Sequence, residues 1–177
     1  MDPAPGRLLV ASPALTDANF VRSVIYLIEH SAQGTLGVII NRPIDMPLAD
    51  IWSEVPEGLA QARTAAQGGP VEPDKGLLLH ACADLDGAGT MGKGICVGGS
   101  IEALAERFRS GPDQQGPRLF LGHSGWSPGQ LDNEIDEGGW IVRSGRPGQL
   151  FDPRPSPNLW QQLAEGRSVG LHDPSPN

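Results

Sequence analysis

The amino-acid sequence predicts a single α+β domain built around a mixed β-sheet. Predicted strands and helices follow one another without strict alternation, and two neighbouring strands form a predicted hairpin, which favours α+β over a doubly wound parallel fold. The 177 residues include 24 glycines and 17 prolines, a content typical of short elements joined by many turns. We expect one domain over residues 1–166, followed by a polar, frayed tail over residues 167–177.

Three strands are predicted near the N-terminus. Residues 7–12, 21–29 and 35–41 are mainly apolar runs, rich in the branched and aromatic side chains that favour strands. The segment Ser-Ala-Gln-Gly at residues 31–34 ends in glycine and predicts a hairpin turn between the second and third strands. Pro43 then ends the third strand.

The rest of the chain predicts short elements punctuated by glycine and proline. Asp45 is placed to cap a short helix, because apolar residues recur after it at helical spacing. Residues 68–73 are too rich in glycine and proline for regular structure. Further predictions are a strand at 76–81, a glycine-rich loop at 84–94, a strand at 95–97, a helix at 101–110 capped by Ser100, a loop at 143–149 and a helix within 156–166.

Residues 119–142 carry the strongest local signals. Apolar residues 119–121 predict a buried strand, and the glycines after it predict a tight turn. Ser127 is placed as the N-cap of a helix, with Gln130 completing a capping box. Residues 140–142 predict a returning strand. We therefore expect a β-α-β unit with a right-handed crossover.

The charge balance disfavours nucleic acid as a partner. Lys and Arg total 13 and Asp and Glu total 21, which gives a net charge of −8. Binding to a phosphate backbone needs clustered basic residues, and those of this chain are scattered along it. An anionic membrane surface is disfavoured for the same reason.

The sequence indicates a cytoplasmic protein. It has no run of 18 apolar residues that would span a bilayer, and its first residues lack the basic and apolar regions of a signal peptide. Cys82 and Cys96 are too few for a disulfide framework and lie in or beside apolar runs, where small core residues are expected.

Ser124 is the candidate for nucleophilic catalysis, because Gly-His-Ser-Gly at residues 122–125 lies between a predicted strand and a predicted helix. A nucleophile elbow requires glycine two residues after the serine, and Trp126 occupies that position. His123 is adjacent to Ser124, so the two side chains of an extended segment point apart. A small residue in a tight turn is the favoured interpretation.

No metal ion or cofactor is predicted. His80-Ala81-Cys82 offers two potential ligands, and no second cluster completes a zinc site. The glycines before Ser100 lack the lysine and spacing of a nucleotide-binding loop, so an ordinary helix cap is favoured.

Several sequence segments, in order, resemble the YqgE/AlgH family of small bacterial proteins from about Gly6 to Trp160. They are Arg22-Ser23-Val24, Glu29-His30, residues 37–43 (GVIINRP), 68–71 (GGPV), Leu79-His80 and 122–131 (GHSGWSPGQL), with Glu134 and Trp140. The resemblance implies an α+β fold with a mixed, bifurcated sheet that includes a small closed barrel and is surrounded by helices. It implies no catalytic activity or cofactor. Family members usually carry Tyr where His123 stands and Ala or Ser where Ser124 stands, which weakens Ser124 as a nucleophile.

We expect a non-catalytic binding or regulatory module that recognises a protein or a small molecule. Polar residues beside strand ends and glycine turns form its candidate binding surface: Arg22, Asn41, Arg42, Gly69, His80, Trp126 and Gln130. The alternative is a hydrolase or transferase that uses Ser124 or His80. A transcription-related regulator comes third, since some family members carry that label while the charge of this chain argues against it.

Overall fold

A computed structural model describes residues 1–109, 111, 113 and 115–166. The predicted frayed tail at 167–177 lies outside these residues. Ten strands and four α-helices are assigned within them, together with three short 3-10 helices. Their bounds are β1 (Leu8–Ala11), β2 (Val24–Ser31), β3 (Gly34–Ile39), β4 (Pro43–Ile44), η1 (Leu48–Asp50), η2 (Glu57–Leu59), β5 (Ala65–Gln67), β6 (Val71–His80), β7 (Gly89–Thr90), η3 (Gly92–Gly94), β8 (Cys96–Val97), α1 (Ile101–Arg107), β9 (Arg118–Trp126), α2 (Gln130–Asp136), β10 (Trp140–Arg143), α3 (Pro147–Phe151) and α4 (Leu159–Ala164).

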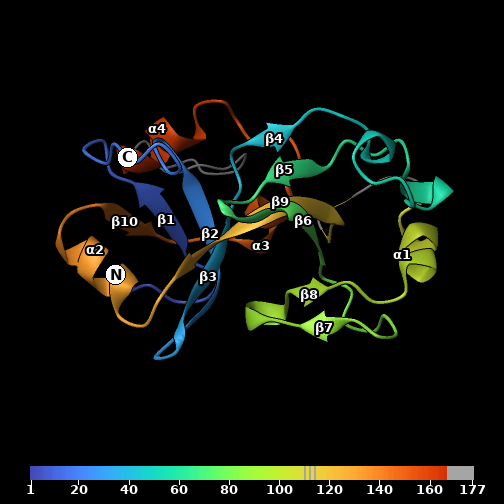
Figure 1. The fold of residues 1–177 in the computed structure, drawn as a ribbon, viewed down its shortest axis with the longest axis horizontal. Coiled ribbons are helices and arrows are strands. Elements are labelled where there is room, and N and C mark those ends of the chain that lie inside the picture. The colour runs from blue at the N-terminus through green and yellow to red at the C-terminus, as the bar shows by residue number, and fades with distance from the viewer. Residues whose placement is uncertain (110, 112, 114, 167–177) are drawn as a thin grey trace, which may run out of the picture.

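All ten strands belong to one curled sheet (Figure 1). Its order is β10-β1-β2-β3-β9-β6-β8-β7, with every neighbouring pair antiparallel, while β5 adds to β9 in parallel and carries β4. The sheet is therefore mixed, as predicted.

The sheet divides at β9. The C-terminal end of β9 pairs with β3, and its N-terminal end pairs with β5 and β6. These pairings give the bifurcation that the resemblance implied. They do not show the closed barrel: among the described residues no pairing joins the ends of the strand path, so the sheet curls as an open half-barrel.

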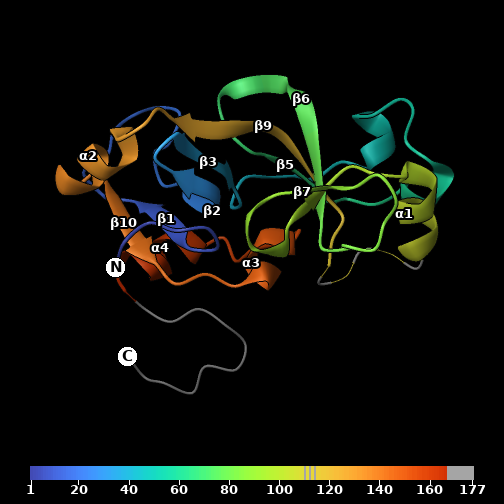
Figure 2. The same ribbon diagram turned by 90° about the horizontal axis from the view of Figure 1, so that it is seen from below.

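Three clusters of buried side chains make up the core. The largest packs α3 and α4 against β1, β2, β3 and β9, and includes Tyr26 and Phe151. A second joins η1, η2 and α1 around Leu104 and Phe108. The third lies under α2 and contains Trp126 and Trp140. Figures 1 and 2 show α2 and α1 at opposite ends of the long axis, so the second and third clusters support different ends of the protein.

The first three predicted strands and their hairpin are confirmed. Pairing of Ser31 with Gly34 closes the turn between β2 and β3. The strand β2 begins later than predicted, at Val24, because Arg22 adopts a left-handed backbone conformation with a φ of 56° that an extended strand does not allow.

The predicted β-α-β unit is only partly present. Strand, helix and strand follow in the expected order, but β1, β2 and β3 lie between β9 and β10, so no crossover joins neighbouring strands. The predicted turn was also wrong, because β9 continues to Trp126. Gly122, with a φ of 75°, bends the strand without ending it. The helix α2 begins after Gly129, and Ser127 does not cap it.

Elements in the middle of the chain differ from expectation in their caps and ends. Asp45 does not cap a helix; Pro47 instead precedes the single turn of η1. The strand β6 starts at Val71, inside the stretch predicted to be irregular, and tolerates Glu72 at a φ of 47° because its pairing with β9 shifts register there. Ser100 caps α1 as predicted, its Oγ accepting the Ala103 N–H at 3.2 Å.

Two segments predicted as loops contain short elements. Residues 84–94 include β7 and η3, and residues 143–149 include the start of α3. No helix among the described residues has the length and apolar character needed to cross a membrane.

Candidate functional site

Five of the seven residues predicted to form a surface meet around the connection between β1 and β2. This segment, residues 17–23, is here called loop 17–23. It opens with a local turn in which the Asp17 carboxylate accepts the Asn19 N–H and the Asp17 carbonyl accepts the N–H groups of Phe20 and Val21. A turn of this kind is what Asp followed by small residues favours. It directs Phe20 inward and leaves Val21 exposed.

Arg42 holds the loop from the end of β3. Its Nη1 donates to the Asn19 carbonyl at 2.7 Å and its Nη2 to the Val21 carbonyl at 3.1 Å. Partial burial lowers the pKa of Arg42, but a guanidinium stays protonated at neutral pH. Two charge-assisted hydrogen bonds from one planar group therefore fix the loop backbone on both sides of Phe20.

Asn41 holds the other end of the loop. Its side-chain amide donates to the Arg22 carbonyl and accepts the Val24 N–H, both at 2.9 Å. The side chain thus extends the hydrogen bonding of β2 beyond the strand. The Arg22 guanidinium lies over the Trp160 ring, 5.3 Å from its centroid. These contacts balance the strain of the left-handed Arg22 backbone, which costs about 1–3 kcal/mol in a non-glycine residue.

Phe20 anchors the loop between two tryptophans. Its ring stacks on Trp126 with centroids 6.0 Å apart and meets Trp140 edge-on at 5.5 Å. The two indoles meet each other edge-on at 5.9 Å. Trp126 is 5% exposed. It therefore supports the loop from below and is not part of an exposed surface.

Glu134 on α2 orders the two tryptophans. Its Oε1 accepts the indole N–H of Trp126 at 3.1 Å and that of Trp140 at 3.0 Å, and its Oε2 accepts the side-chain N–H of Gln130 at 2.9 Å. Gln130 in turn accepts the Ser127 N–H, which is the half of the predicted capping box that forms. This arrangement links α2, β9 and β10 beneath loop 17–23.

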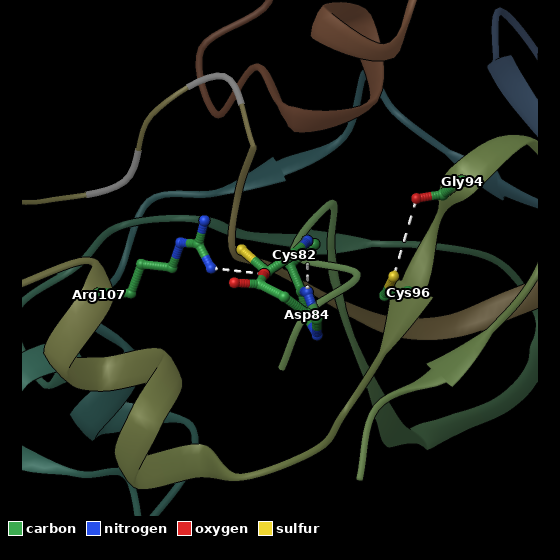
Figure 3. A network of polar contacts seen from close by, with 6 residues as sticks. Cys82, Asp84, Gly94, Cys96 and Arg107 are labelled. Atoms are coloured by element: carbon green, nitrogen blue, oxygen red, sulfur yellow. Dashed lines mark hydrogen bonds and ion pairs between the residues drawn. The ribbon is translucent and has the colours of Figure 1, made fainter. Parts of the chain in front are cut away.

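His80 lies away from the loop and is fully buried. Its Nε2 is 2.7 Å from the Gly98 carbonyl and its Nδ1 accepts the Cys82 N–H at 3.1 Å. Together these contacts assign the Nε2-protonated tautomer and occupy both ring nitrogens. Figure 3 shows the neighbouring network, in which Arg107 pairs with Asp84 at 2.8 Å.

The thiols beside His80 do not form a catalytic pair with it. Burial raises the pKa of Cys82, although the charge of Arg107 opposes the shift, so the thiol stays protonated. Cys96 points its sulfur to the Gly94 carbonyl at 3.8 Å (Figure 3). Within the part of the chain that the structure describes, no group of three or more His, Cys, Asp or Glu residues is placed to hold a metal ion.

Ser124 and Gly69 meet at a close crossing of two backbone segments. Ser124 is fully buried and its hydroxyl donates to the Gly68 carbonyl at 3.1 Å. A Cβ on Gly69, whose φ is 153°, would lie 2.2 Å from the His123 carbonyl oxygen. Ser124 ties the crossing together, and Gly69, which has no Cβ, makes it possible.

Sequence reasoning did not place Phe20, Val21 or Glu134 in the site. The four-residue spacing of Gln130 and Glu134 on one helix was a usable signal, because side chains four apart share a face. No local pattern marked Phe20, whose aromatic partners come from β9 and β10.

Comparisons with known proteins find relatives of this chain in one family. A family model described as AlgH-like matches residues 8–171. A UPF0301 protein of Streptomyces avermitilis is 37% identical over 169 residues, covering 89% of this chain and 83% of the relative. A UPF0301 protein of Anaeromyxobacter dehalogenans is 37% identical over 184 residues, covering 97% and 90%.

Two solved structures have a similar fold. A crystal structure of a Corynebacterium diphtheriae protein aligns with a TM-score of 0.71 and 28% identity, covering 97% of this chain and 91% of the other. The solution structure of the AlgH protein from Pseudomonas aeruginosa aligns with a TM-score of 0.70 and 30% identity, covering 97% and 95%.

Proposed function

The chain belongs to the AlgH-like family, and from the geometry of loop 17–23 we propose that it is a non-catalytic module that binds a protein partner through this loop. The observation that carries the proposal is the double contact from Arg42 to the Asn19 and Val21 carbonyls, which holds an exposed loop in one conformation. A preformed loop loses little conformational entropy when a partner binds.

The side chains that the loop presents suit a protein partner. Val21 is 43% exposed and Arg22 beside it is exposed as well. Arginine is enriched at the centres of protein interfaces, and strained backbone positions cluster at functional sites. We propose that the partner offers an apolar side chain to Val21 and a carboxylate to Arg22.

The same geometry gives no support to catalysis by Ser124 or His80. Both side chains are fully buried, and each donates to or accepts from backbone groups. A nucleophile or base must reach a substrate atom. We keep the cytoplasmic location predicted from the sequence as part of this proposal.

Affinity capture with matched valine variants tests the proposal. Val21→Glu places a charge on the loop, and Val71→Glu makes the same change at a valine of β6 that is 38% exposed. We expect the wild type and Val71→Glu to retain one stoichiometric partner protein, and Val21→Glu to bind it at least about tenfold more weakly. Equal retention by both variants, or no stoichiometric partner of the wild type, would contradict the proposal. Equal melting temperatures of the three proteins would show that folding is not the cause.

A further inference from the structure

An open pocket lies at the α1 end of the protein, and its lining residues indicate a class of ligand. Its volume is about 570 Å³, within the range of small-molecule sites. It lies where η2, residues 61–63, the end of α1 and the segment between α3 and α4 meet. Since α1 and α2 lie at opposite ends of the molecule (Figure 2), this pocket is separate from loop 17–23 and its support.

The pocket is basic although the protein is acidic. Arg63, Arg109 and Arg154 line it, and Glu57 is the one carboxylate among the described residues of the lining. The lining thus carries a net charge of +2, while the whole chain carries −8. Positive charge focused in a concave site attracts small anions even when the protein as a whole repels them.

The three guanidinium groups are available to a ligand. Arg63 pairs with Asp45 and Arg109 with Glu106, but both pairs are exposed to solvent, where an ion pair contributes little free energy. Among the described residues, no carboxylate lies within ion-pair distance of the Arg154 side chain. A ligand oxyanion can therefore replace weak contacts at two arginines and meet, at Arg154, a guanidinium that pairs with no carboxylate of the described residues.

The rest of the lining suggests what accompanies the anionic group. Half-buried Ala62 contributes apolar surface next to the arginines, whereas Phe108, also in the lining, is only 1% exposed. Guanidinium groups bind phosphate and carboxylate oxygens through paired N–H donors, and three of them suit a dianion better than a monoanion. We propose that the pocket binds a small organic phosphate whose phosphate contacts Arg63, Arg109 and Arg154 and whose apolar group rests on Ala62.

Calorimetry with phenyl phosphate tests this inference. Wild-type protein should bind one equivalent, and more tightly than it binds inorganic phosphate, which lacks the apolar group. Because the second phosphate pKa is about 6, affinity should rise several-fold between about pH 5 and 7 as the dianion forms. No saturable binding up to about 10 mM, or equal affinity for inorganic phosphate, would overturn the proposal.

Two variants and one mapping experiment locate the site. Arg154→Met should weaken phenyl phosphate binding at least about tenfold, whereas Lys75→Met, which removes the same charge from an exposed position on β6, should leave it within about twofold. Amide resonances of Gly58 and Ala62 should shift on titration, and those of loop 17–23 should not. Unchanged affinity in Arg154→Met, or shifts centred on the loop, would contradict the assignment. Neither result bears on partner binding by Val21, so the two proposals fail independently.

Discussion

The Phe20 ring stacks on the Trp126 indole with an interplanar angle of 21°, and this contact joins an exposed loop to the interior of the sheet. Phe20 comes from the connection after β1, and Trp126 is the last residue of β9. The stack therefore connects the loop that exposes Val21 to the indoles of Trp126 and Trp140 and to the Glu134 carboxylate. A loop anchored in this way behaves as part of the folded core.

Phe20→Leu should lower the free energy of unfolding by about 1 kcal/mol. The substitution keeps most of the apolar contact and removes two aromatic pairs, each worth about 0.5–1.5 kcal/mol in ideal geometry and less for a half-buried ring. Urea denaturation of the wild type and the variant measures the difference. A variant as stable as the wild type would show that the stack does not anchor the loop.

Glu134→Gln should destabilise the protein by about 1–2 kcal/mol although the side chains have the same shape. The carboxylate accepts from Trp126, Trp140 and Gln130, whereas an amide turns one acceptor into a donor facing another donor. Asp132→Asn, an exposed change two residues earlier on α2, is the matched control and should cost less than about 0.5 kcal/mol. Equal effects would mean that only the charge of α2 matters.

Gly69→Ala should prevent folding or cost more than about 3 kcal/mol. Its Cβ would lie 2.2 Å from the His123 carbonyl oxygen, and backbone atoms on both segments limit relaxation. Gly148→Ala in α3 meets no atom within 4 Å and should stabilise by about 0.5–1 kcal/mol, because alanine favours the helix. Circular dichroism and thermal melting separate the two. A folded Gly69→Ala with unchanged melting temperature would refute the tight crossing.

Arg118 provides a pH test of the core. It is fully buried, donates to the Leu150 and Ile40 carbonyls, and has its pKa lowered to about 10 by burial, with Asp152 opposing the shift. The unfolded chain, with the higher arginine pKa, then binds more protons above about pH 10 than the folded protein does. The burial cost is therefore fully present below pH 10 and is relieved as pH rises.

The stability of the wild type relative to Arg118→Met should accordingly rise by about 1 kcal/mol between about pH 9 and 11. Denaturant unfolding of both proteins across that range gives the difference, in which the other titrating groups cancel. A relative stability that stays flat or falls with pH would contradict the buried, charged arginine.

Local patterns predicted the strands whose partners are near in sequence. The hairpin of β2 and β3 needs only two mainly apolar runs and a glycine turn, and the cap formed by Ser100 needs only its own helix. The path of β9 depends on β3, β5 and β6, which pair with it from far earlier in the chain, so Gly122 looked like a turn. Periodicity contains no information about which distant strand supplies the missing hydrogen bonds.

The residues of the candidate site also divide into those that local sequence signals could indicate and those that they could not. Asn41, Arg42 and Arg22 stand beside strand ends, where polar side chains hold loops, and this position is why the sequence analysis included them in the candidate surface. Burial of Trp126 could not be predicted, because its partner Phe20 lies far earlier in the sequence and neither residue belongs to a periodic pattern. His80 is a polar residue that can be buried because the Gly98 carbonyl and the Cys82 N–H form hydrogen bonds with its two ring nitrogens.

The claim on which the proposed function depends is that Arg42 holds loop 17–23 in one conformation. Backbone ¹⁵N relaxation of the wild type and Arg42→Met measures this directly. We predict order parameters of about 0.85 for residues 19–22 in the wild type, equal to those of the sheet, and values below about 0.6 in Arg42→Met, with the sheet unchanged. Low values for these residues in the wild type, or equal values in the two proteins, would contradict the claim.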